Sequence, residues 1–235
     1  MADKNRVGLI VPSSNINMED EFRMVLPKEI KLHSDRMRMR RVTPSELKSM
    51  DKEALNAAVR LSDADVGAIV YGCTIAITSR KQGYHEIVRK RLEHATHTKV
   101  IISAAAVLDA MRYMNMRKIA VATPYTKAVT EAEIDYFKKA GFEVVDYKYL
   151  GIADNLKVGN LPEEIAYKLA KKLDISEADG ILVSCAELPS INILDRLEKE
   201  SKKTVISTNT ASLWKVLKTI GSKKKINGFG KILSR

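Results

Sequence analysis

The chain repeats part of its own pattern after 112 residues, and no other feature of the sequence restricts its fold as much. A shift of that length brings like residues together at corresponding strand ends and helix starts. The matching pairs are Pro12 and Pro124, Ser14 and Thr126, Glu19 and Glu131, Glu21 and Glu133, Ile69 and Ile181, and Cys73 and Cys185. Such self-similarity indicates a duplicated structural unit. We therefore expect two similar lobes related by a pseudo-two-fold axis.

Short apolar runs alternate with helical patterns in both halves of the chain. Helices are predicted at residues 19–26, where Glu19, Asp20 and Glu21 suit the positive end of the helix dipole, and at residues 130–140, before Gly141. Alternation of this kind predicts α/β lobes of the Rossmann-like (flavodoxin-like) type, with parallel sheets. The expected strands are residues 7–11, 67–71, 100–103, 118–123, 143–147, 180–184 and 205–207.

The length and the repeat together place the boundary between the lobes. A chain of 235 residues suits two lobes of about 100–120 residues each. We expect a linker near residues 115–117 and a return of the chain after Ile206. The first lobe then comprises residues 1–115 and about 207–235, and the second comprises residues 116–206. Because ligands of open α/β sheets bind outside the carboxyl ends of the strands, the active site is expected in the cleft between the lobes.

The chain is basic, with 40 Lys and Arg residues against 29 Asp and Glu residues and a net charge of +11. A basic surface can attract nucleic acid, steer a small dianion, or do neither. No helix-turn-helix, zinc finger or aromatic RNA-binding signature accompanies the scattered charges, so nucleic acid is not an expected partner. No apolar run approaches the roughly 20 residues that span a bilayer, and the polar start predicts no secretory signal. We expect a cytoplasmic protein without a membrane partner.

The two cysteines are the leading candidates for chemistry. Cys73 follows the strand at residues 67–71, and Cys185 ends the equivalent strand at residues 180–184. In a cytosolic chain they should be free thiols, and two cysteines alone cannot form a four-ligand zinc site. Backbone N–H groups at a strand–helix junction favour a thiolate and can bind a carboxylate. With pseudo-two-fold symmetry, the thiols would face one small substrate from opposite sides; a buried structural role is the alternative.

Polar side chains follow the equivalent strands. Ser14 and Asn15 can donate hydrogen bonds to a substrate carboxylate, or they can cap the next helix. Tyr125 offers its hydroxyl from the repeat-related loop, where the alternative is a rim aromatic. Asn155 follows Asp154 in a polar segment that is either a substrate contact or a plain turn.

In this order, the motifs resemble the maleate cis-trans isomerase and arylmalonate decarboxylase branch of the aspartate/glutamate/hydantoin racemase superfamily. The resemblance covers nearly the whole chain. The motifs are Val-Pro-Ser-Ser-Asn with Met18-Glu19, Tyr71-Gly72-Cys73-Thr74, Ala122-Thr123-Pro124-Tyr125-Thr126, Asp154-Asn155, Ser184-Cys185 and Asn227-Gly228-Phe229-Gly230.

The resemblance implies two similar α/β lobes with the site between them, no metal and no organic cofactor, and assembly as a homodimer or homotetramer. It matches Cys73 to the nucleophilic cysteine and Cys185 to the second cysteine. It matches Asn15, Tyr125 and Asn155 to substrate-binding positions. The full set of expected substrate-binding residues is Ser14, Asn15, Thr74, Tyr125, Asn155 and Ala186.

Two cysteines favour the isomerases and racemases, because the decarboxylases keep only the second one. We expect a small dicarboxylate substrate and conversion of maleate to fumarate, with a covalent adduct on Cys73 and Cys185 as acid or base. The alternatives are a two-thiol racemase of an amino acid or hydantoin, an arylmalonate-type decarboxylase, and a non-catalytic basic binding protein.

The chain departs from the family's pattern after each cysteine. Ile75, Ala76 and Ile77 follow Cys73-Thr74 where the family often has small residues. Ala186-Glu187 follows Cys185, where a threonine is usual. If Glu187 faces the cleft, its charge would repel a substrate carboxylate.

Overall fold

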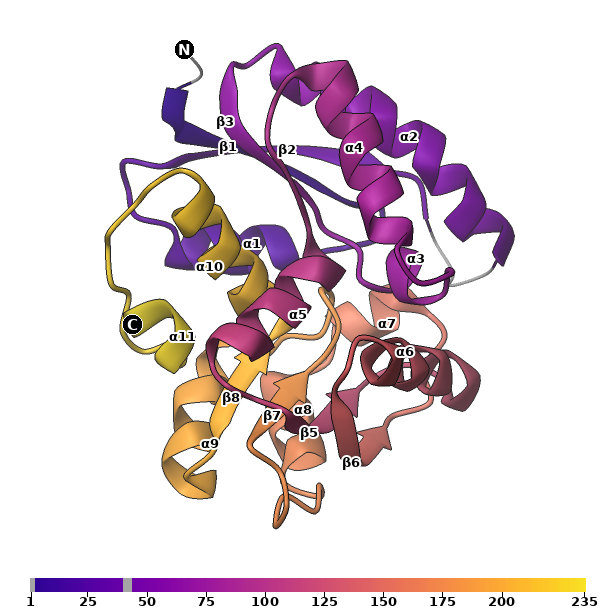
Figure 1. Cartoon of the computed structure of the whole chain (residues 1–235), viewed down its shortest axis with the longest axis vertical. Coiled ribbons are helices and arrows are strands. Elements are labelled where there is room, and N and C mark those ends of the chain that lie inside the picture. Colours follow the sequence, from indigo (N-terminus) through magenta and orange to yellow (C-terminus); the bar gives the residue numbers. More distant parts are fainter. Residues whose placement is uncertain (1–2, 40–43) are drawn as a thin grey trace.

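The computed structural model describes residues 3–39 and 44–235, and its strands form two sheets covered by helices (Figure 1). The strands are β1 (Asp3–Pro12), β2 (Lys31–Met37), β3 (Val66–Tyr71), β4 (Val100–Ile102), β5 (Lys118–Thr123), β6 (Glu143–Tyr149), β7 (Gly180–Val183) and β8 (Thr204–Ser207). The sheet orders are β2-β1-β3-β4 and β6-β5-β7-β8, and all neighbouring strands run parallel.

Helices connect the strands, as parallel pairing requires. In the first half they are α1 (Met18–Val25), α2 (Pro44–Ser62), α3 (Ile75–Thr78), α4 (Tyr84–Thr96) and α5 (Ser103–Tyr113). In the second half they are α6 (Lys127–Lys139), α7 (Asn155–Gly159), α8 (Glu163–Ala170), the 3-10 helix η1 (Ile191–Ile193), α9 (Leu194–Ser201), α10 (Thr208–Thr219) and α11 (Lys231–Ser234). No helix among residues 3–39 and 44–235 is long and apolar enough to cross a membrane.

The two sheets have the same strand order, as the repeat predicts, and the expected α/β fold with two lobes is confirmed. Strands β2 and β6 begin and end at residues separated by the 112-residue shift seen in the sequence. The inner strands β3, β5 and β7 are almost wholly buried. This burial explains their continuous apolar sequences.

The edge strands β2 and β6 differ from the sequence-based prediction, whereas the buried edge strands β4 and β8 agree with it to within one residue. Strand β2 was missed altogether, and β6 continues to Tyr149 instead of ending at residue 147. Both strands are mostly half-buried and carry many polar residues, because each has a sheet neighbour on one side only. Their sequences therefore lack the apolar run by which a central strand is recognised.

Helices α5 and α10 lie between the lobes and bring the two halves of the chain together (Figure 1). Each follows the last strand of one sheet and contacts the edge strands of both sheets, β4 and β8. The hydroxyl of Ser212 on α10 lies 2.9 Å from the hydroxyl of Ser103 on α5, and Lys215 Nζ lies 2.6 Å from Asp109 Oδ2. We propose on the basis of these contacts that residues 1–115 and 207–235 form the first lobe and residues 116–206 the second.

Enlarging the side chain at the α5–α10 contact should destabilise the protein. Ser212 is fully buried, so Ser212→Leu inserts extra atoms into a filled interface and should lower the free energy of unfolding by about 2–3 kcal/mol. Ser212→Ala removes only the hydroxyl and should cost about 1 kcal/mol. Urea denaturation monitored by circular dichroism measures both values. Equal midpoints for the two variants would contradict close packing of these helices.

Candidate active site

Cys73 follows β3 by two residues, and Thr74 separates it from the short helix α3. A side chain at Gly72 would place its Cβ 2.7 Å from Met18 Sδ and 2.8 Å from the Ile10 carbonyl oxygen, so the chain passes close to β1 just before the thiol. Burial raises the pKa of Cys73 to about 12, against the opposing effect of the Ala76 and Ile75 N–H groups. The thiol is therefore protonated at neutral pH.

Cys185 occupies the equivalent place after β7, on a strained backbone. Its φ angle of 146° lies in a region that side chains rarely adopt, at a typical cost of about 1–3 kcal/mol. Its N–H group donates to Thr208 Oγ1 at 3.1 Å, and its Sγ accepts from the Glu187 N–H group at 3.3 Å. Burial raises its pKa to about 12, while the hydroxyl of Tyr125 and the backbone of Glu187 act in the opposite direction.

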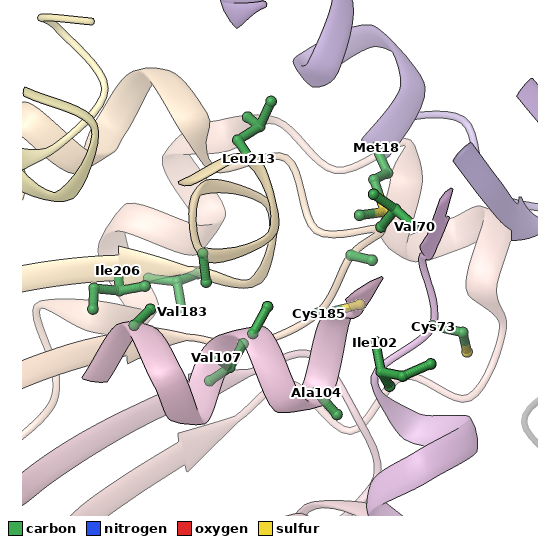
Figure 2. Packing of buried hydrophobic residues seen from close by; sticks show 14 of the residues in the cluster. Met18, Val70, Cys73, Ile102, Ala104, Val107, Val183, Cys185, Ile206 and Leu213 are labelled. Atoms are coloured by element: carbon green, nitrogen blue, oxygen red, sulfur yellow. The ribbon is translucent and has the colours of Figure 1, made fainter. Parts of the chain in front are cut away.

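Tyr125 links the two thiols. Its buried hydroxyl donates to Cys185, and its pKa is raised well above its usual value by burial and then by the charges of Cys185, Glu133 and Cys73. Figure 2 shows the two thiols in the same region of the buried core. The structure therefore brings Cys73, Cys185 and Tyr125 together from the two lobes.

Asn15 crosses from the first lobe to the second. Its Nδ2 donates to the Ala186 carbonyl oxygen at 3.3 Å, and its Oδ1 accepts from the Met18 N–H group at 3.0 Å. The side chain thus caps the start of α1 while it holds the residue after Cys185. The contact with the Met18 N–H group corresponds to the capping alternative, and binding of a substrate carboxylate by Asn15 stays a prediction.

Ser14 and Asn155 form a second connection between the lobes. Asn155 Nδ2 donates to Ser14 Oγ at 3.0 Å, and Asp154 caps α7 by accepting from the Lys157 N–H group at 3.1 Å. Of the expected binding residues, Thr74 stands apart: its buried hydroxyl has no hydrogen-bond partner among the described residues.

A cavity of about 830 Å³ opens beside the Ser14 loop. Arg36 supports the loop, because its Nη1 donates to the carbonyl oxygens of Asn15 at 2.7 Å and Ser13 at 3.3 Å. The described lining includes neither cysteine. Its lining residues are Ser13, Ser14, Arg36, Arg38, Glu53, Asp154 and Leu156.

Two buried carboxyl groups near the site were not among the sequence-based candidates. Glu133 accepts from Ser184 Oγ at 2.9 Å, and its other oxygen has no hydrogen-bond partner within the described part of the chain. Glu21 accepts from the N–H groups of Ser190 at 2.9 Å and Ile191 at 3.1 Å. Burial raises the pKa of each carboxyl group to about 7. Their match in the repeat was the available signal, but the sequence links Glu21 only to the helix dipole of the first helix.

Glu187 does not present its carboxylate to the cavity lining. The two oxygens accept from the Ile16 N–H group at 3.1 and 3.0 Å, so the carboxylate is directed to the first lobe. These hydrogen bonds place the Glu187 carboxyl group between the two lobes, so the expected repulsion of a substrate carboxylate stays a prediction. Among the residues that the structure describes, no group of three His, Cys, Asp or Glu side chains could hold a metal ion.

One thiol from each of two duplicated α/β lobes defines a class of enzymes in which two cysteines act on one substrate. Similarity to known proteins agrees with this class. A model of the arylmalonate decarboxylase family matches residues 7–233. A maleate isomerase of Geobacillus stearothermophilus is 37% identical over 100% of this chain and 99% of its own.

Solved structures show the same relationship. The maleate isomerase Iso variant of Pseudomonas putida S16, crystallised with maleate, superposes with a TM-score of 0.93 at 37% identity and covers 97% of each chain. A Nocardia farcinica maleate cis-trans isomerase mutant with a covalently bound succinylcysteine intermediate has a TM-score of 0.94 at 30% identity, over 97% of this chain and 98% of that one. The chain belongs to the arylmalonate decarboxylase family, in the branch with the maleate isomerases, and the resemblance seen in the sequence is confirmed.

Replacing Glu133 by Gln should make the protein more stable at alkaline pH. The folded chain holds a proton on Glu133 up to about pH 7, so stability from this group is greatest below its unfolded pKa of 4.5 and is lost as pH rises through 7. Gln keeps an acceptor for Ser184 and cannot ionise. Relative to wild type, the variant should gain roughly 1 kcal/mol of unfolding free energy per pH unit between about pH 5 and pH 7, and the gain should level off above pH 7.

Urea denaturation at pH 5, 6, 7 and 8 measures this difference. The control is Glu131→Gln on the same helix, whose carboxylate is half exposed and pairs with Lys127. Its difference from wild type should not depend on pH over this range. A constant difference for Glu133→Gln as well would show that Glu133 does not titrate as described.

Proposed function

We propose that this protein is an isomerase that converts maleate to fumarate through a covalent adduct on Cys73, with Cys185 as acid and base. The observation that carries the proposal is the pair of buried thiols from repeat-related strand ends. The charges of both thiols act on the pKa of Tyr125. Relatives that are maleate isomerases match the whole chain at 37% identity, and one related structure holds a succinylcysteine. Both support the same chemistry here.

Asn15, Asn155 and Ser14 are the proposed carboxylate ligands. Their side chains lie on loops at the carboxyl ends of the strands, where they hydrogen-bond across the lobes. Backbone N–H groups beside Cys73 supply further donors, and Tyr125 orients the other end of the substrate. Thr74 and Ala186 adjoin the two cysteines and complete the proposed binding surface.

The proposed reaction begins with the Cys73 thiolate. It adds to one alkene carbon of maleate, and the electron pair of the double bond moves toward the adjacent carboxylate to give an enediolate. The Cys185 thiol protonates the neighbouring carbon, which leaves a succinyl group on Cys73 and a thiolate on Cys185. The central bond is now single and rotates. Cys185 then removes a proton from the same carbon, Cys73 leaves, and fumarate is released with both thiols in their initial states.

Proton NMR in deuterated buffer tests the function directly. Wild-type protein with maleate should produce fumarate, and Cys73→Ala should abolish turnover because no adduct can form. Cys185→Ala should lose at least a hundredfold in rate, since general acid–base catalysis typically contributes 10²–10⁴-fold. Mass spectrometry of the Cys185→Ala protein with maleate should show a succinyl adduct on Cys73. Full activity of Cys73→Ala would rule out this scheme.

The same assay separates the alternatives. A racemase would exchange solvent deuterium into the α-position of an amino acid or hydantoin and leave maleate unchanged. A decarboxylase would release carbon dioxide from a substituted malonate. A non-catalytic binding protein would turn over none of these compounds and would be indifferent to loss of both cysteines.

The thiol pKa values predict how the rate depends on pH. Burial raises the pKa of Cys73 to about 12, so its thiolate fraction is small at neutral pH and grows with pH. The value of kcat/KM should therefore rise by about tenfold per pH unit between pH 7 and 9. Initial rates at low maleate concentration measure it. A profile that is flat across this range would mean that the free enzyme already holds the thiolate.

We extend the proposal to location and assembly: a cytoplasmic enzyme, active as a homodimer or homotetramer. Free buried thiols at the site fit a reducing compartment. Exposed apolar side chains, among them Met24 and Ile87, offer surfaces for contacts between copies. Light scattering after size-exclusion chromatography gives the number of copies, and a single mass at the monomer value would contradict assembly.

A further inference from the structure

The proposed mechanism uses the two thiols but leaves unexplained a buried carboxylate two residues after Cys185. We propose that Glu187 is a positioning residue that holds the Asn15 loop of the first lobe in register with Cys185 of the second. The inference deepens the proposed function, because it concerns the same site. It rests on the hydrogen bonds that Glu187 makes and on the lack of room for a side chain at Gly159.

Glu187 binds the backbone that leads from the Asn15 loop into α1. Its carboxylate accepts from the Ile16 N–H group at 3.1 and 3.0 Å and from the Asn17 N–H group. In return, Asn17 Nδ2 donates to the Glu187 carbonyl oxygen at 3.0 Å and to the Gly159 carbonyl oxygen at 2.8 Å. The second lobe therefore holds Ile16 through its backbone N–H group and Asn17 through its side chain as well.

On its own lobe, Glu187 is tied to the thiol. Its N–H group donates to Cys185 Sγ at 3.3 Å. Between them, the Ala186 carbonyl oxygen accepts from Asn15 Nδ2 at 3.3 Å and from Asn209 Nδ2 at 3.2 Å. A displacement of Glu187 would move a hydrogen-bond donor of the thiol and the acceptor of the Asn15 amide together.

A third segment is shaped around the same carboxylate. A Cβ atom at Gly159 would lie 2.0 Å from Glu187 Oε1, so the last residue of α7 can carry no side chain while Glu187 stays in place. Helix α7 begins at Asn155, which reaches Ser14. Glu187 thus meets both segments that bear the proposed side-chain ligands of the substrate carboxylates, the loop of Ser14 and Asn15 and helix α7.

The charge of Glu187 also acts on Cys185. Burial raises the pKa of Glu187 to about 8, a direction reinforced by Glu21 on α1 and opposed by the backbone N–H groups of Ile16 and Asn17 and by Arg36 on β2. When Glu187 ionises, its negative charge raises the pKa of Cys185. The reactivity of that thiol should therefore report the state of Glu187.

The experiment compares Glu187→Ala and Glu187→Gln with Glu198→Ala as a matched control. Glu198 is also a buried carboxylate that accepts from two backbone N–H groups, those of Val205 and Lys231, each at 2.9 Å, and it lies away from both cysteines in sequence and contacts. Its removal should lower thermal stability to a similar extent. Any effect on the site that exceeds the control then belongs to the position of Glu187.

The first readout does not depend on the substrate. Alkylation by iodoacetamide, followed separately for the two cysteine peptides by mass spectrometry, should be at least tenfold faster at Cys185 in Glu187→Ala and within twofold of wild type at Cys73. In wild type, the logarithm of the Cys185 rate should rise with pH and bend near pH 8, whereas Glu187→Gln should give a straight line. If Glu187 had only a structural role, its replacement would change the alkylation rates of both cysteines together. The wild-type pH profile of the Cys185 rate would then show no bend near pH 8.

The second readout is turnover of maleate. Glu187→Ala should lose at least tenfold in kcat and Glu187→Gln less, while Glu198→Ala stays within twofold. Gly159→Ala, which forces the carboxylate to move, should resemble Glu187→Ala. If maleate is not a substrate but the alkylation results hold, the proposed function fails and the positioning role stands. If Glu187→Ala matches Glu198→Ala in both readouts, the positioning role is wrong and the function is untouched.

Discussion

Two buried carboxylates cross between the lobes in opposite directions, and the geometry of the site depends on this exchange. The side chain of Glu21 on α1 accepts hydrogen bonds from the N–H groups of Ser190 and Ile191. In the opposite direction, the side chain of Glu187 accepts from the N–H groups of Ile16 and Asn17. Each lobe thus satisfies backbone donors of the other that would otherwise be buried without partners, which costs about 1–3 kcal/mol for each group. Separation of the lobes would expose both sets of donors and both acids at once.

The same burial sets the chemical state of the thiols. A rise in thiol pKa from 9.0 to about 12 lowers the thiolate fraction at neutral pH by roughly a thousandfold. The resting protein is therefore protected from thiol oxidation and from metal capture, both of which require the thiolate. As a consequence, the Cys73 thiol must lose its proton inside a buried site before it can act as a nucleophile. Tyr125 and the short stretches of backbone N–H groups beside each sulfur are the polar groups placed to favour this loss.

The sequence predicted those parts of the molecule that repeat and those that are buried on both faces. The shift of 112 residues indicated two similar sheets, and the apolar runs before Cys73 and Cys185 located the strand ends where the thiols lie. Strand β2 was not predicted, because its polar, half-buried sequence shows neither an apolar run nor a regular alternation of apolar and polar residues. Glu21 and Glu133 were not predicted as buried site residues for another reason: nothing local distinguishes a glutamate that tertiary contacts will bury from one that stays in water. Whether the binding residues act as assigned is still a prediction.

The position of α10 also affects how the chain folds during synthesis. This helix follows the last strand of the second sheet, yet it contacts β3 and β4 of the first. When the ribosome has completed the first four strands, that part of their apolar surface has no helix to cover it. The first lobe therefore stays partly open until α10, about a hundred residues later in the chain, has been synthesised. Contacts between segments so far apart in sequence form slowly. Chaperone binding to nascent chains that end before α10 should therefore concentrate on the first sheet.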